Sequence, residues 1–347
     1  MSGAAAVSRL AGLAEAGLLP DALVRFGIRR MLAERLREVA ARSPAAQQAF
    51  LAACRQSAIA LVPERANEQH YEVPPQFFEC VLGPHLKYSC CLWDANVATL
   101  AEAEDLMLAQ SCERADVRDG MAVLDLGCGW GSFSLYVAAR FPACRVLAVS
   151  NSKPQREFIL ARAAQRGLAN LTVVTADVNH FEAPERFDRV ISIEMFEHVR
   201  NHEALLARIA TWLAPEGRLF VHHFCHREHA YPYEDAGTSD WMARHFFSGG
   251  MMPSEDWLQL FERDLAQVNR WRVGGMHYAR TSEAWLANLD AQRSRLRPLF
   301  AATYGEHDAQ RWIQRWRLFF LACAELFAHR DGGEWFITQQ LLAPAGR

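Results

Sequence analysis

The residues best suited to chemistry begin with a glycine-rich loop, Asp125-Leu-Gly127-Cys-Gly129-Trp-Gly131. Glycines at this spacing permit a tight turn and let backbone N–H groups approach a bound molecule closely. No Lys-Ser or Lys-Thr pair follows the last glycine, as it would in a phosphate-binding loop. The pattern therefore favours a site for S-adenosylmethionine, and the alternative is a sharp strand-to-helix turn that binds nothing.

A second group of reactive side chains stands further along the chain. Glu197 and His198 follow the apolar run 187–193, and three histidines share the segment His222-His-Phe-Cys-His226. An acid beside an imidazole could deprotonate or orient an ammonium group that receives a methyl group. The alternative for His198 is a hydrogen-bonded structural histidine. We expect no metal ion, because the HHxxH segment is more typical of a hydrogen-bonded scaffold than of a zinc site.

The elements that must hold these residues follow from short apolar runs that alternate with helical periodicity. The expected strands span residues 122–126, 145–149, 171–176, 187–193 and 217–224, with a last strand at 334–342, and the helices between them span 132–140, 153–166 and 202–213. This alternation predicts a parallel, doubly wound α/β sheet. Its carboxyl edge, where such sheets place their ligands, would carry both reactive groups.

Two segments stand outside that unit. Residues 1–66 have a helical pattern and form the expected N-terminal extension, so the catalytic domain would span residues 67–347. Residues 225–275 are aromatic and glycine-bearing, with an expected helix at about 254–267. We predict that this segment is a cap inserted over the pocket.

Composition excludes several classes of protein. The chain has 347 residues with 37 Lys+Arg and 40 Asp+Glu, so its formal net charge of −3 gives no indication of a nucleic-acid partner. No apolar run approaches the roughly 18 residues of a membrane span, and charges interrupt the apolar start, so we expect mature sequence. Nine cysteines without disulfide or zinc spacing indicate reduced thiols in a cytoplasmic protein.

One stretch departs from the neutral balance. Residues 25–42 hold six arginines against two glutamates, with apolar residues between them. This helix could lie on anionic lipid as a peripheral membrane contact. The alternative is the solvated face of a helix that packs on the catalytic domain.

The separated motifs together resemble one family, the cyclopropane-fatty-acid synthase superfamily of S-adenosylmethionine-dependent enzymes. They are Tyr71 in His70-Tyr-Glu-Val, Tyr88-Ser-Cys-Cys-Leu-Trp93, the glycine-rich loop, Ser150-Asn-Ser-Lys-Pro-Gln155, Met195-Phe-Glu-His198 and His277-Tyr-Ala-Arg-Thr281. The resemblance runs from about residue 66 to the C-terminus and is closest overall to the coclaurine N-methyltransferase-like branch. It implies a Rossmann-like class I methyltransferase with a seven-stranded, mostly parallel sheet.

The resemblance also implies which residues hold S-adenosylmethionine, the co-substrate. They are Tyr71, Tyr88 and Ser89 at the methionine end, Asp125, Gly127, Gly129 and Gly131 in the loop, Ser150, Asn151 and Gln155 at the ribose, and Asp177 near the adenine. Many nucleoside-binding folds place an acid at the ribose, whereas this sequence offers only Ser, Asn and Gln there. The segment 150–155 is equally compatible with an ordinary helix start capped by serine.

The acceptor of the methyl group is left open by the sequence. In fatty-acid cyclopropane synthases a bicarbonate takes the proton while a ring closes on an alkene, and the residues that hold it match Cys90, Glu197, His222 and Tyr278. The leading expectation is therefore one-carbon transfer to the double bond of an unsaturated lipid acyl chain, giving a cyclopropane or methyl-branched product. Cys90 would serve that anion site through its backbone.

Overall similarity favours a different acceptor, a small aromatic amine methylated on nitrogen with the help of Glu197 and His198. The N-methylating relatives keep the Cys and Glu positions but carry an acid and Phe where this chain has His222 and Tyr278. A third possibility is a lipid- or methyl-donor-binding module without turnover, and the complete acid and base set disfavours it.

Overall fold

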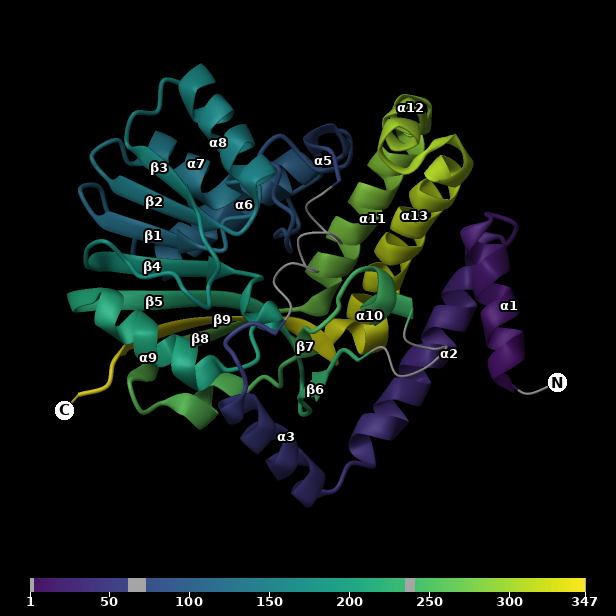
Figure 1. Cartoon of the computed structure of the whole chain (residues 1–347), viewed down its shortest axis with the longest axis horizontal. Coiled ribbons are helices and arrows are strands. Elements are labelled where there is room, and N and C mark those ends of the chain that lie inside the picture. Colours follow the sequence, from purple (N-terminus) through teal and green to yellow (C-terminus); the bar gives the residue numbers. More distant parts are fainter. Residues whose placement is uncertain (1–2, 62–72, 235–240, 347) are drawn as a thin grey trace.

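The sheet at the centre of the computed structural model has seven strands, and the structure describes residues 3–61, 73–234 and 241–346 (Figure 1). In sheet order the strands are β3 (Leu171–Thr175), β2 (Arg145–Ser150), β1 (Ala122–Leu126), β4 (Phe187–Ile193), β5 (Leu213–His226), β9 (Trp335–Pro344) and β8 (Leu265–Val273). The strands from β3 to β5 pair in parallel, while β9 is antiparallel to both of its neighbours. The predicted mostly parallel sheet is confirmed.

Alternate side chains of the central strands enter two separate cores, as the two-residue period of a strand requires. Val123 and Ile191 pack on one face, whereas Leu124 and Val190 pack on the other. The first face is covered by α6 (Leu100–Arg114), α7 (Ser132–Arg140) and α8 (Lys153–Gln165), and the second by α3 (Pro44–Gln56) and α9 (His202–Trp212). Burial on both faces explains the continuous apolar runs that predicted these strands.

The seven strands implied by the resemblance are present, but the residue pattern did not locate the seventh, and the helix expected at 254–267 is wrong. The structure has a short 3₁₀ helix, η2 (Trp257–Phe261), and then β8 at the sheet edge. Trp257, Leu258 and Phe261 are buried at helical spacing, which accounts for the expectation. The middle of β8 is polar and exposed because the strand pairs only with β9, so it lacks the apolar alternation that identifies a strand.

The rest of the segment expected to form a cap folds, where the structure describes it, as short elements. A two-stranded ribbon joins β6 (Tyr231–Pro232) to β7 (Met251–Met252), and α10 (Trp241–His245) stands between them in sequence. Beside the sheet, the helices α11 (Gly275–Ala291), α12 (Arg293–Tyr304) and α13 (Glu306–Ala328) form a third core together with α5 (Pro75–Val81).

The N-terminal helices α1 (Gly3–Glu15) and α2 (Asp21–Ala40) lie along α13, outside the sheet (Figure 1). Arg25 pairs with Glu283 at 2.6 Å and with Glu325 at 3.0 Å, and Arg29 pairs with Glu325 at 2.5 Å. These two arginines of the 25–42 stretch therefore bind the catalytic domain. None of the described helices is long and apolar enough to cross a membrane.

Gly275, the first residue of α11, lets that helix begin against two other segments. A Cβ atom at this position would overlap the backbone carbonyl oxygens of Phe327 and Trp335, whereas one at Gly274 would meet nothing. The contact is between backbones, which cannot move aside as a flexible side chain could. The start of α11 is therefore fixed against the end of α13 and the start of β9.

We expect Gly275→Ala to lower the free energy of unfolding by about 2–3 kcal/mol, because overpacking forces the backbone to shift. The adjacent Gly274→Ala is the control and should change it by less than about 0.5 kcal/mol. Urea unfolding followed by tryptophan fluorescence measures both. Equal stabilities of the two variants would contradict this account of the helix start.

Candidate active site

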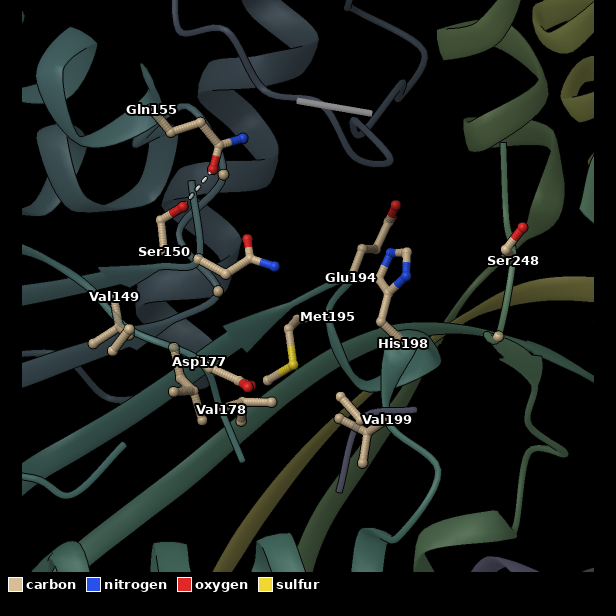
Figure 2. Close-up of a pocket in the computed structure, with 17 residues that line it drawn as sticks. Val149, Ser150, Gln155, Asp177, Val178, Glu194, Met195, His198, Val199 and Ser248 are labelled. Carbon is tan, nitrogen blue, oxygen red and sulfur yellow. Dashed lines mark hydrogen bonds between the residues drawn. The ribbon is translucent and has the colours of Figure 1, made fainter. Parts of the chain in front are cut away.

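A pocket opens at the carboxyl ends of β1, β2 and β4 (Figure 2). It encloses about 820 Å³, part of which is open to solvent. Its lining residues are Ala60, Leu126, Gly127, Gly129, Val149, Ser150, Asn151, Gln155, Ala176, Asp177, Val178, Glu194, Met195, His198, Val199, Ser248 and Gly249. The pocket therefore joins the glycine-rich loop to the turn that follows β4, which the sequence had marked as two separate reactive groups.

The glycine-rich loop has a backbone that only glycine adopts without strain. Gly127, Gly129 and Gly131 have φ angles of +84°, +53° and +80°. A Cβ on Gly127 would overlap Met195, whereas one on Gly129 would enter open space at the pocket. Beneath the loop, the buried Asp125 carboxylate accepts a hydrogen bond from the Ser134 hydroxyl at 2.5 Å, and burial raises the pKa of Asp125 to about 6.

A donor suited to a nucleoside faces the pocket beyond the loop. The Ser150 hydroxyl donates to Gln155 Oε1 at 2.6 Å, and Figure 2 shows this pair at the pocket wall. Gln155 Nε2 is buried and has no protein partner among the described residues. Asp177, across the pocket, accepts from the Asn179 N–H at 2.9 Å. An orphaned amide donor fits a ribose hydroxyl, so the residues present fit S-adenosylmethionine.

The residues expected at the methionine end are placed differently. Tyr88 packs against Phe78 and Trp285, with ring centroids 5.2 and 5.5 Å apart, and does not line the pocket. Ser89 Oγ accepts from the fully buried Lys87 ammonium at 2.5 Å. Tyr71 lies outside the described residues. Roles for these three in cofactor binding stay predictions.

A buried carboxylate, Glu194, joins three of the residues expected at the reactive centre. Its Oε1 accepts from the Cys90 backbone N–H at 2.8 Å, and its Oε2 accepts from the Tyr278 hydroxyl at 2.6 Å. His222 Nε2 lies 3.3 Å from Oε1, close to the carboxylate but without the geometry of a hydrogen bond. Glu194 also lines the pocket, so the cluster and the pocket share this side chain.

The expected acid, Glu197, is not the carboxylate that these three residues meet, and it contacts β5 instead. Its Oε1 accepts from the Phe224 N–H at 2.6 Å, on β5, and its Oε2 has no partner among the described residues. Burial, and next the charge of Glu194, raise the pKa of Glu197 well above its usual range. The structure thus gathers Cys90, His222 and Tyr278 around Glu194, whereas Glu197 accepts from β5.

Sequence reasoning missed Glu194, although its position carried a signal. It directly follows the apolar run of β4, at the sheet edge where ligands bind. Its φ of +50° places it in the left-handed region, which costs a residue with a side chain roughly 1–2 kcal/mol. Backbone strain of this kind gathers at functional sites.

The histidines separate into one at the pocket and others that support the fold. His198 lines the pocket and stacks on Phe247 with centroids 4.5 Å apart, and burial lowers its pKa to about 4. His223 Nδ1 lies 3.0 Å from the Phe224 carbonyl oxygen, and His226 Nδ1 accepts two backbone N–H groups. Among the residues described, no three His, Cys, Asp or Glu side chains are arranged to hold a metal ion.

The expected bicarbonate does not fit this arrangement. The Cys90 N–H, the Tyr278 hydroxyl and the His222 imidazole all meet the Glu194 carboxylate. A side chain of this protein therefore already occupies the groups that were expected to hold the anion.

We expect Gly129→Val to weaken S-adenosylmethionine binding at least tenfold, because its branched side chain would enter the pocket. Gly120→Val is the matched control, since Gly120 also has a positive φ, +89°, with open space around it, but does not line the pocket. Calorimetric titration measures both affinities. A loss of affinity in both variants, or in neither, would contradict the placement of the cofactor beside Gly129.

Comparison with known proteins places the chain among methyltransferases. The profile of the family described as mycolic acid cyclopropane synthetase matches residues 62–333. (S)-coclaurine N-methyltransferase of Thalictrum flavum subsp. glaucum is 40% identical over 94% of this chain and 93% of its own. A crystal structure of coclaurine N-methyltransferase bound to N-methylheliamine and SAH superposes with a TM-score of 0.93, at 38% identity, covering 97% of this chain and 99% of that one. Cyclopropane-fatty-acyl-phospholipid synthase of Escherichia coli K12 is 29% identical over 78% of this chain and 66% of its own.

Proposed function

This chain belongs to the mycolic acid cyclopropane synthetase family and is an S-adenosylmethionine-dependent methyltransferase, and we propose that its acceptor is the nitrogen of a small aromatic amine. The relative that is similar along nearly its whole length is named for N-methylation, whereas the lipid-modifying relative is matched less fully. A small aromatic amine therefore replaces the unsaturated acyl chain as the leading candidate for the acceptor.

The observation that carries the proposal is the Glu194 carboxylate at the pocket wall. When bound, S-adenosylmethionine supplies an electrophilic methyl group on a sulfonium. An amine attacks that methyl group only as the free base, so the enzyme must attract an ammonium group and remove its proton. A fixed carboxylate beside the acceptor can do both, because opposite charges attract strongly where water is excluded.

The reaction balances without a further co-reactant. The nitrogen–carbon bond forms as the carbon–sulfur bond breaks, and the proton on nitrogen passes to a base. His198 offers an uncharged imidazole at the same pocket, since burial keeps its pKa near 4. Glu194 attracts the cation and His198 or Glu194 receives the proton.

The surroundings of Glu194 keep the charge at one place. Burial, and next the neighbouring carboxylate, raise the pKa of Glu197 well above its usual range, which disfavours a second negative charge beside Glu194. Aromatic rings pack behind the residues that line the pocket, with Phe247 stacked on His198 and Tyr278, which donates to Glu194, stacked on Phe327 at 4.3 Å. Aromatic faces attract ammonium groups and pack against an aromatic acceptor.

We expect methyl-labelled cofactor to transfer its label to a tetrahydroisoquinoline amine and not to vesicles of unsaturated phospholipid. Glu194→Gln should lower kcat for the amine at least 100-fold, because a neutral amide neither attracts the ammonium group nor accepts its proton. Glu197→Gln is the matched control and should stay within about fivefold, since its side-chain oxygen can still accept from the Phe224 N–H.

Label found in the lipid with loss of one methyl hydrogen would show ring closure on an alkene and overturn the amine proposal. A larger loss for Glu197→Gln than for Glu194→Gln would contradict the role of Glu194.

A further inference from the structure

A row of side chains crosses the sheet from the active site to its far edge. Ile193 at the end of β4 pairs with His222 on β5, His222 with Gln339 on β9, and Gln339 with Trp271 on β8. The Arg114 guanidinium, from the last turn of α6, lies over the Trp271 ring, 5.2 Å from its centroid. Glu194 continues the row at its inner end.

The hydrogen bonds along this row have a single direction. Arg114 Nη1 donates to Gln339 Oε1 at 2.5 Å, and Gln339 Nε2 lies 3.0 Å from His222 Nδ1. A guanidinium has only donors, so the amide oxygen of Gln339 must face Arg114 and its NH₂ group must face His222. His222 Nδ1 is then an acceptor, and the ring proton must be on Nε2, 3.3 Å from Glu194 Oε1.

We propose that Gln339 and Arg114 are positioning residues that hold His222 as the neutral tautomer protonated on Nε2, so that its remaining N–H faces Glu194 at 3.3 Å. Arg114 holds the amide in this orientation, because a guanidinium cannot accept from the NH₂ group, and both Gln339 and His222 are fully buried. The second N–H of the amide lies 3.3 Å from Met107 Sδ, a weak acceptor that does not by itself prevent rotation. His222 thereby orients the carboxylate and leaves the removal of the substrate proton to other groups.

The next pair along the same strands supplies a contrast. His223 Nδ1 lies 3.0 Å from the Phe224 carbonyl oxygen, which can only accept, so its proton is on Nδ1. Gln340 Nε2 lies 3.3 Å from His223 Nε2. The partners of these two adjacent histidines thus set them in opposite tautomers. Of the two, His222 is the one that lies beside Glu194. Gln340 is therefore a matched control for Gln339.

The direct test is nitrogen NMR of the full chain labelled with ¹⁵N-histidine, without acceptor, with His222 assigned by loss of its signals in His222→Asn. We expect a protonated Nε2 and an unprotonated Nδ1 in the wild type. Gln339→Glu should add a proton on Nδ1, because its carboxylate can only accept, while Nε2 keeps its proton toward Glu194 and Arg114 remains to balance the new charge. Arg114→Met, at a half-exposed position, should give a mixture of tautomers, because the amide is then free to turn.

Kinetics test the consequence for catalysis, which rests on the proposed role of Glu194. Gln339→Met should lower kcat at least tenfold and leave the KM for S-adenosylmethionine within twofold, while Gln340→Met changes kcat by less than twofold. A wild-type His222 protonated on Nδ1, or a protonation pattern of His222 unchanged in both Gln339→Glu and Arg114→Met, would overturn the proposal. The tautomer does not depend on the acceptor, so its failure is distinguishable from failure of amine methylation.

Discussion

The structure of the site depends on one carboxylate, Glu194, which is removed from water and ringed by donors. Such a group is costly to bury unless each oxygen is satisfied. The donors come from the loop before α6, from β5 and from α11, segments that are distant in sequence and meet only when the fold is complete. The left-handed backbone at Glu194 directs the side chain into this ring, and the contacts offset its strain.

Burial shifts the pKa of several titratable groups near Glu194 toward their uncharged forms. Burial keeps the pKa of His198 near 4 and raises that of Tyr278 well above its usual range, with the Glu194 charge adding to the effect on Tyr278. Tyr278 therefore stays a hydroxyl donor to Glu194, and the raised pKa of Glu197 favours its protonated form.

The sequence could predict those parts of this arrangement in which a local physical requirement determines the residue type. Positive φ angles require glycine at 127, 129 and 131, so the cofactor loop could be found from its letters. Burial on both faces made the parallel strands visible as apolar runs. The edge strand β8 was missed because it has polar residues and needs only backbone pairing with β9.

Glu194 and Gln339 were not identified from the sequence for a different reason, since their roles depend on residues that are close in space but distant in sequence. Two acids three residues apart follow β4, and nothing local shows which of them meets Cys90 and Tyr278. Gln339 is one polar residue in an expected strand until its register with His222 is known. The resemblance grouped Cys90, His222 and Tyr278 with Glu197, whereas the structure places these three residues around Glu194.

The central claim is that the Glu194 carboxylate is a built-in anion where the sequence led us to expect bicarbonate. Its most direct test is the turnover rate with and without bicarbonate for the wild type and for Glu194→Gly, a substitution that suits the positive φ at this position. We predict that the wild-type rate is the same in CO₂-free buffer, and that the variant loses activity and regains part of it when bicarbonate is added. A wild-type rate that requires bicarbonate would contradict the account.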